Sequence, residues 1–326
     1  MVCIAARGCI AARGCIAARG LHRRAWLHRR ARLGSERLTT ASLCDDRHVD
    51  LGKVGVWTFY RALGEDSAGA AASLAERLGF GALWIGGSPR LPNMRPLLEA
   101  SERLVVATGI VNIWHYEPEQ LAAEFAELDA DFPGRLLVGI GIGHPENTDE
   151  YARPLATTRA FLDRLDRAPA QLPADRRCLA ALAPRMLALS AERSLGTHPY
   201  FTAVAHTRTA RMAVGPGALV APELACVLDE DRERGRATAR AYAEHYLGLR
   251  NYRNALLAHG FDESDCVDGG SERLIDEVVP QGSVSKIAAV VRRHFDAGAD
   301  HVCLQSLGEP AVPIQAWSAL AAELIS

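Results

Sequence analysis

Two histidines stand where this sequence is best equipped for proton chemistry. His144 follows Gly143 directly at the end of the apolar run RLLVGIGIG, and His115 follows the run LVVATGIVNIW. An imidazole has an unperturbed pKa of about 6.5, so it gains and loses a proton near physiological pH. General acid or base catalysis is therefore the chemistry that these residue types allow. The alternative for His144 is that it only caps the next helix together with Pro145.

Several other kinds of chemistry lack the residue spacing that they need. The chain has eight cysteines, but none forms a CxxC pair or a cysteine–histidine spacing typical of a metal site. No cluster of acidic residues and histidines predicts a metal site either. The formal net charge of −2 offers no field for nucleic acid or an acidic membrane. No run approaches the roughly 18 apolar residues of a membrane-spanning helix, and the scattered cysteines fit a reducing cytoplasm.

Short strand-like runs alternate with amphipathic stretches from residue 52 onward. Eight such runs, each followed by a helical pattern, are typical of a (β/α)8 barrel of the TIM type, an α/β fold. A dinucleotide-binding fold is the alternative, but it needs GxGxxG after the first strand and an acidic residue about 20 positions later. GIGIGH follows the fourth run and lacks that acid. The predicted strands are 53–60, 82–87, 104–114, 135–143, 178–182, 198–204, 218–229 and 300–307.

Prolines and glycines predict where several helices begin and end. A helix over 67–78 ends at Gly79, and Pro118 and Pro184 lie in the first turns of two others, where a missing N–H costs nothing. A helical elaboration is predicted over 249–280. Of the other predicted helices, one begins near His206 and a long one runs through Tyr246. Another covers 283–297, and the last closes the chain from Pro310.

The first fifty residues differ from the rest. Residues 2–19 read VCIAAR, GCIAAR and GCIAAR, and residues 21–32 read LHRRAW and LHRRAR. Repeats this short supply no two-faced pattern that buries a core. We therefore predict a disordered low-complexity extension over 1–50, or residues upstream of a true start at Val49, and one barrel domain over 51–326. A transit peptide or a nucleic-acid-binding arm is the alternative for this arginine-rich segment.

Four segments, taken together, resemble the luciferase-like oxidoreductases, and most of all their actinobacterial branch that uses the deazaflavin coenzyme F420. The resemblance covers about residues 51–308. It implies a luciferase-like barrel with its chemistry at the carboxyl ends of the strands. It also implies a cytoplasmic enzyme, expected as a homodimer, that moves hydride between F420 and a small organic substrate. The segments are LVVATGIVNIW (104–114), PGRLLVGIGIGHPE (133–146), AALAPRML (180–187) and GADHVCLQ (298–305).

The same resemblance assigns coenzyme contacts to several strand ends. The segment 108–110 aligns with a bulge beneath the coenzyme ring, where the family often has a non-prolyl cis peptide. The end of the 135–143 run aligns with a strand end that meets the coenzyme, and the 181–185 and 203–207 loops resemble phosphate-binding strand ends. The coenzyme-binding candidates are Gly86, Gly87, Thr108, Gly109, Ile110, Asn112, Gly143, Asn147, Ala183, Arg185, His206 and Thr207.

The second predicted strand departs from the family pattern. Many relatives place an acid pair at its end, whereas this chain has Gly86 and Gly87, which move no protons. His144 aligns with the acidic proton donor of a sugar-phosphate-oxidising relative, so the resemblance gives it the catalytic role, with His115 as the next candidate. Two alternatives stay open: a monooxygenase that uses FMN and oxygen, and a non-catalytic flavin-binding barrel. The sequence leaves the substrate open.

Overall fold

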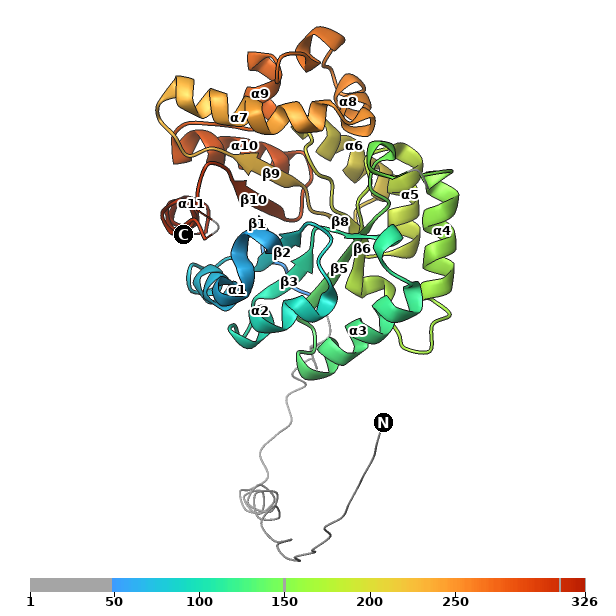
Figure 1. Ribbon diagram of the computed structural model, residues 1–326. Coiled ribbons are helices and arrows are strands. Elements are labelled where there is room, and N and C mark those ends of the chain that lie inside the picture. Colours follow the sequence, from blue (N-terminus) through green and yellow to red (C-terminus); the bar gives the residue numbers. More distant parts are fainter. Residues whose placement is uncertain (1–48, 149–150, 311, 326) are drawn as a thin grey trace, which may run out of the picture. The chain divides into compact units, whose positions relative to one another are not determined.

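A computed structural model describes residues 49–148, 151–310 and 312–325, so the predictions made for residues 1–48 lie outside the described residues. The strands are β1 (Val54–Phe59), β2 (Ala82–Gly86), β3 (Val105–Thr108), β4 (Val111–Asn112), β5 (Leu136–Gly141), β6 (Arg177–Leu179), β7 (Gly196–Thr197), β8 (Leu219–Val220), β9 (Glu223–Cys226) and β10 (Val302–Ser306). They pair in parallel in the order β8-β7-β6-β5-β3-β2-β1-β10-β9, and β4 pairs with β5. Figure 1 shows them at the centre with helices around them.

The two ends of this order, β8 and β9, are halves of one strand, because only Ala221 and Pro222 separate them. β8 pairs with β7 on one side, while β9 pairs with β10 on the other. The backbone between the halves stays paired: the N–H of Ala221 donates to the carbonyl of Thr197, and the N–H of Cys303 donates to that of Pro222. The sheet therefore closes into a (β/α)8 barrel, which confirms the predicted fold.

A bulge interrupts the third barrel strand between β3 and β4. Ala107 pairs with Leu137, and Val111 pairs with Ile140, so this strand has one residue more than β5 over the same span. An extra residue of this kind locally disrupts the ladder and redirects side chains. The peptide bond within residues 109–110 is cis, as the family resemblance implied.

The helices follow the strands and cover the outside of the barrel (Figure 1). Pro118 and Pro184 are the first residues of α3 and α5, as predicted. None of the described helices is both long and apolar enough to cross a membrane. The helices are α1 (Tyr60–Arg77), α2 (Arg95–Glu99), α3 (Pro118–Asp131), α4 (Pro154–Leu165), α5 (Pro184–Arg193), α6 (Val204–Val214), α7 (Arg232–Leu247), α8 (Arg250–Leu257), α9 (Glu272–Val278), α10 (Val284–Asp296) and α11 (Ile314–Leu324).

Three predicted boundaries are wrong. The strand predicted over 198–204 is β7, which already ends at Thr197, and the apolar residues that follow leave the sheet. Within β7, Gly196 lies so close to the backbone of Leu219 that no β-carbon fits there. The first helix begins at Tyr60 instead of residue 67, because it continues through a kink at Gly64. The closing helix begins at Ile314 instead of Pro310, after a turn at Gly308, whose φ is 73°.

The barrel interior beneath the strand ends is packed with side chains. Trp84 is fully buried and stacks on His198, with ring centroids 4.1 Å apart. Its indole N–H donates to Nε2 of His301 over 3.1 Å. Burial lowers the pKa of both histidines to about 4, so both rings are neutral at neutral pH. The barrel is therefore a filled core, and a ligand site has to lie at one of its ends.

Helices α7, α8 and α9 lie together on one side of the barrel (Figure 1). They share an apolar cluster with β9 that contains Leu247, Tyr252, Leu256 and Leu274. This cluster corresponds to the helical elaboration predicted over 249–280. It carries residues toward the mouth of the barrel that no strand could supply.

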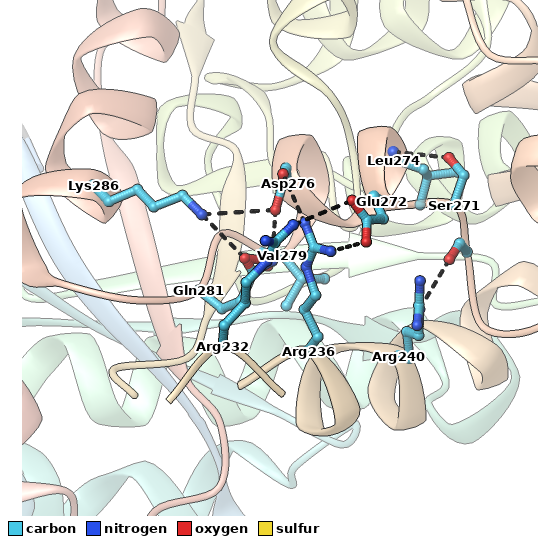
Figure 2. Close-up of polar contacts among 11 residues, drawn as sticks. Arg232, Arg236, Arg240, Ser271, Glu272, Leu274, Asp276, Val279, Gln281 and Lys286 are labelled. Atoms are coloured by element: carbon cyan, nitrogen blue, oxygen red, sulfur yellow. Dashed lines mark hydrogen bonds and ion pairs between the residues drawn. The ribbon is translucent and has the colours of Figure 1, made fainter. Parts of the chain in front are cut away.

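Polar contacts add to this packing between α7 and α9 (Figure 2). Arg236 of α7 forms ion pairs with Glu272 and Asp276 of α9, the second at 3.4 Å. One turn further along α7, Arg240 Nε donates to the carbonyl of Gly270 over 3.2 Å. Exposed ion pairs contribute about 0–1 kcal/mol each, so the apolar cluster supplies most of the stability and the ion pairs add to it.

Candidate functional site

The carboxyl ends of the barrel strands surround a cavity of about 910 Å³. Cavities of this size hold small molecules and cofactors, and this end of a TIM barrel is where its chemistry occurs. The cavity collects candidates from several predicted strand ends. Those in its lining are Gly87, Gly109, Ile110, Asn112, His115, Gly143, His144 and Ala183.

The floor of the cavity is mostly bare backbone, formed by Gly87, Gly109, Ile110, Gly141 and Gly143. The bulge places Ile110 over β5. A β-carbon added to Gly141 of β5 would lie 2.8 Å from Cδ1 of Ile110. A β-carbon on Gly143, whose φ is 72°, would lie 2.8 Å from Nδ2 of Asn112. Side chains are therefore excluded at these positions, and a flat ligand can approach the backbone closely.

Two buried nitrogens without partners flank Gly109. Trp57 Nε1 and His198 Nε2 have no hydrogen bond within the described residues, and a side chain on Gly109 would run into both. His198 Nδ1 lies 2.7 Å from the carbonyl oxygen of Ala221, so Nδ1 carries the proton and Nε2 a lone pair. The floor is thus bordered by one free donor, the Trp57 N–H, and one free acceptor, His198 Nε2.

His144 is held in one tautomer at the edge of the cavity. Its Nδ1 lies 2.8 Å from Oδ1 of Asn251, an acceptor, so Nδ1 carries the proton and Nε2 the lone pair. Burial lowers the pKa of His144 below 6.5, and the hydrogen bond to Asn251 opposes that shift. The ring is therefore neutral at neutral pH. Its Nε2 is ready to accept a proton.

His115 lines the same cavity from a more exposed position. Its Nδ1 lies 3.2 Å from Oγ of Ser88, which accepts a hydrogen bond of 2.9 Å from the backbone N–H of Asn112. Ser88 therefore has its own hydroxyl hydrogen free for His115. This serine follows Gly86 and Gly87, and no sequence pattern indicated its contact with His115.

Several other candidates lie outside the cavity lining. Gly86 packs against the ring of Trp57, where a side chain would overlap it. Thr108 is fully buried, and its hydroxyl donates to the carbonyl of Gly139 over 3.0 Å. Arg185 lies in the exposed first turn of α5. The side chain of Asn147 lies outside the described part of the chain.

The two candidates on α6 are also buried behind the cavity. His206 Nε2 lies 3.0 Å from the carbonyl oxygen of Leu182, and burial lowers the pKa of this histidine to about 4. Thr207 Oγ1 lies 2.8 Å from Nδ1 of His294. His206 therefore supports the loop after β6 from behind, whereas Thr207 connects α6 to α10.

The cavity has a roof that sequence reasoning did not assign to the site: Asn251 and Tyr252 of α8, and His259 just after it. Tyr252 packs on the ring of His144, with centroids 5.1 Å apart. His259 Nε2 lies 3.1 Å from Oγ1 of Thr209 on α6. The elaboration was predicted as helix, but no pattern indicated which of its faces turns toward the barrel.

The electrostatics of the cavity come from histidine and backbone. Its lining, among the described residues, contains no lysine, arginine, aspartate or glutamate. It contains the five histidines His115, His144, His198, His245 and His259. No group of acidic residues, cysteines and histidines in the described chain could hold a metal ion. A negatively charged ligand group would therefore meet backbone N–H groups and imidazoles.

This fold and this cavity define a closed parallel barrel with a small-molecule site built from glycine backbone and histidines. The chain belongs to the luciferase-like monooxygenase family, whose sequence profile matches residues 53–290. The family contains oxidoreductases, as the resemblance implied. A search of curated protein sequences finds no significant match.

Solved structures share the fold at low sequence identity. An F420-dependent secondary alcohol dehydrogenase in complex with an F420–acetone adduct has a TM-score of 0.65 and 15% identity over 82% of this chain and 98% of its own. An F420-dependent tetrahydromethanopterin reductase from Methanopyrus kandleri also scores 0.65, with 14% identity over 85% and 99%. The oxygenating constituent of 3,6-diketocamphane monooxygenase from Pseudomonas putida, in complex with FMN, scores 0.59, with 16% identity over 84% and 98%.

Proposed function

We propose that this protein is an F420-dependent oxidoreductase that transfers hydride between the deazaflavin ring and a small alcohol or carbonyl compound. The observation that carries the proposal is the meeting, in one cavity, of a floor made mostly of glycine backbone and a neutral histidine in a fixed tautomer. A flat ring needs the first feature. Proton transfer coupled to hydride transfer needs the second.

The residues present fit a deazaflavin or flavin ring. The face of the ring would lie on Gly109, Ile110 and Gly143. A β-carbon added to either glycine would clash with its neighbours, and the side chain of Ile110 lies against β5. When bound, the deazaflavin supplies a ring carbon that gives or accepts hydride.

The acidic tail of the coenzyme would be held without a cationic side chain from the described cavity lining. Ala183 and Pro184 line the cavity at the start of α5, where the positive end of the helix dipole favours an anion. His259 and Thr209 lie in the same lining. Weak charge at this end predicts a tail affinity that falls little with added salt.

His144 is the group that we propose exchanges the substrate proton. In alcohol oxidation the hydroxyl proton passes to Nε2 of His144, while Asn251 holds Nδ1–H and keeps the ring in place. In carbonyl reduction the same nitrogen returns the proton. The lowered pKa of His144 leaves the base form dominant at neutral pH.

The choice of F420 over FMN is supported by the two F420-dependent enzymes among the similar structures, which have higher TM-scores than the FMN-bound monooxygenase. Equilibrium titration of the protein with each oxidised coenzyme, followed by absorbance and by quenching of tryptophan fluorescence, tests this choice. We expect F420 to bind about tenfold or more tightly than FMN. Preferential FMN binding would instead support the flavin monooxygenase, and binding of neither would support a non-catalytic barrel.

A further inference from the structure

A second cavity of about 380 Å³ lies beside the large one, and we call it the annex. Trp57, Phe59, His245 and Tyr246 line both cavities, so the annex opens off the same mouth. Its other walls come from the ends of β1 and β10 and from α7 and α11. Neither the floor nor the roof of the large cavity reaches it.

Gln305 is the polar group built into the annex. This residue of β10 is only 6% exposed and lines the annex. The hydroxyl of Tyr200 donates to its Oε1 over 2.8 Å, and the hydroxyl of Tyr242 donates to Tyr200 over 2.8 Å. In this arrangement Oε1 of Gln305 faces the two phenols and its amide nitrogen faces away from them.

This orientation leaves Nε2 of Gln305 as a donor without a partner within the described residues. Nε2 is not fully buried, and Gln305 lines the annex. The annex is therefore suited to a ligand that brings a hydrogen-bond acceptor to this nitrogen.

The remaining walls select against charge. Trp57, Leu307, Pro310 and Trp317 supply apolar surface. Apart from His245, Glu309 is the only titratable acidic or basic side chain among the described lining residues. A carboxylate or phosphate would be repelled by Glu309 and would find no cation, so a neutral acceptor with an apolar body fits best.

We propose that the annex binds a neutral, oxygen-bearing part of the organic reactant on a small apolar ring or chain, with this oxygen accepting from Nε2 of Gln305 and lying apart from the oxygen that exchanges its proton with His144. The identification of this ligand as the reactant rests on the proposed function. The binding site itself does not, because it needs no coenzyme.

Ligand-observed NMR on the full chain without coenzyme tests the proposal with three probes of one shape. Cyclohexanone has the oxygen, methylenecyclohexane lacks it, and cyclohexanecarboxylate carries a charge. We expect cyclohexanone to bind about five- to tenfold more tightly than either of the others, the usual effect of one neutral hydrogen bond. Equal affinities, tighter carboxylate binding, or no binding of any probe would overturn the proposal.

Gln305→Met provides the matching variant, because methionine keeps the length of the side chain and removes the amide donor. Cyclohexanone should bind about five- to tenfold more weakly to it, and unchanged affinity would overturn the assignment. Gln315→Met, on the exposed face of α11, is the control. If Gln305→Met fails to fold, the probe series on the unaltered protein still decides. F420 titration of the same samples separates failure of the annex from failure of the proposed function.

Discussion

The floor and the roof of the large cavity are held in place by different kinds of interaction. The floor belongs to the barrel ladder: Gly109 donates its N–H to the carbonyl of Ile85 over 2.8 Å, and the bulge around it is set by strand register. The roof, formed by Asn251, Tyr252 and His259, depends on side chains packed between α7, α8 and α9. The floor is therefore rigid and intolerant of added atoms, whereas the roof can be altered residue by residue.

This difference assigns the two regions different work. In the proposed function, the floor would determine whether a flat coenzyme fits. The roof holds His144, the proposed proton-exchanging residue, through its contact with Asn251. A change in the floor should affect folding and binding together, and a change in the roof should affect the rate and pH dependence of the reaction.

Gly109→Val should break the floor. Its side chain would overlap Trp57 and crowd His198, so we expect a loss of about 1–3 kcal/mol in the free energy of unfolding and a coenzyme affinity lower by about tenfold or more. Gly217→Val is the control, since an added β-carbon there meets nothing within 4 Å. Urea denaturation and coenzyme titration measure both effects. Wild-type stability and affinity in Gly109→Val would show that the floor is not where the ring lies.

His144→Ala should remove proton exchange and leave the floor intact. A well-placed general acid or base contributes about 10²–10⁴-fold to a rate, so kcat should fall at least about tenfold. Coenzyme affinity should stay within about threefold. Steady-state kinetics with a secondary alcohol and absorbance titration report the two quantities. A wild-type kcat would transfer the role to His115, which Ser88 positions on the opposite side of the mouth.

Asn251→Leu sharpens the same comparison from the roof. It removes the hydrogen bond that raises the pKa of His144, so that pKa falls further. Activity in alcohol oxidation requires neutral His144 and is lost as the pH falls through its pKa. The acidic limb of the pH–rate profile should therefore move to lower pH, with a few-fold lower kcat. A limb that stays in place, or moves to higher pH, contradicts the contact.

Arg236→Met should have the smallest effect. This arginine is 12% exposed and pairs with Glu272 and Asp276, so its loss should lower the free energy of unfolding by about 1 kcal/mol. Arg232→Met is the matched control: Arg232 is 74% exposed and lies 3.4 Å from Glu272, and its loss should cost less than about 0.5 kcal/mol. Thermal unfolding of both variants separates them. Equal shifts would show that the α7–α9 register does not depend on Arg236.

The barrel and its floor could be predicted from the sequence because their signals are local. Apolar runs marked most strands, Pro118 and Pro184 marked helix starts, and the glycines of the floor stood at strand ends where a family pattern could be matched. β7 was misplaced because it is only two residues long, so the longer apolar run after it gave the stronger signal.

The roof could not be predicted in the same way. Asn251 and His144 are 107 positions apart in the chain, and their contact depends on how α8 packs against the barrel. Ser88 likewise acts through a turn in which its φ is 53°, a conformation that its sequence context did not indicate. Contacts between segments so distant in sequence follow from tertiary packing and leave no periodic pattern.

We propose that floor and roof together support hydride transfer to F420, which an anaerobic single-turnover experiment measures. Oxidised F420 is mixed with the protein and with cyclohexanol, and the deazaflavin absorbance is followed. We expect the absorbance to fall as cyclohexanone forms. The rate of this fall should be lower by about tenfold or more in His144→Ala than in the unaltered protein. Unchanged F420 absorbance, with substrate consumed only when reduced FMN and oxygen are supplied, would contradict it.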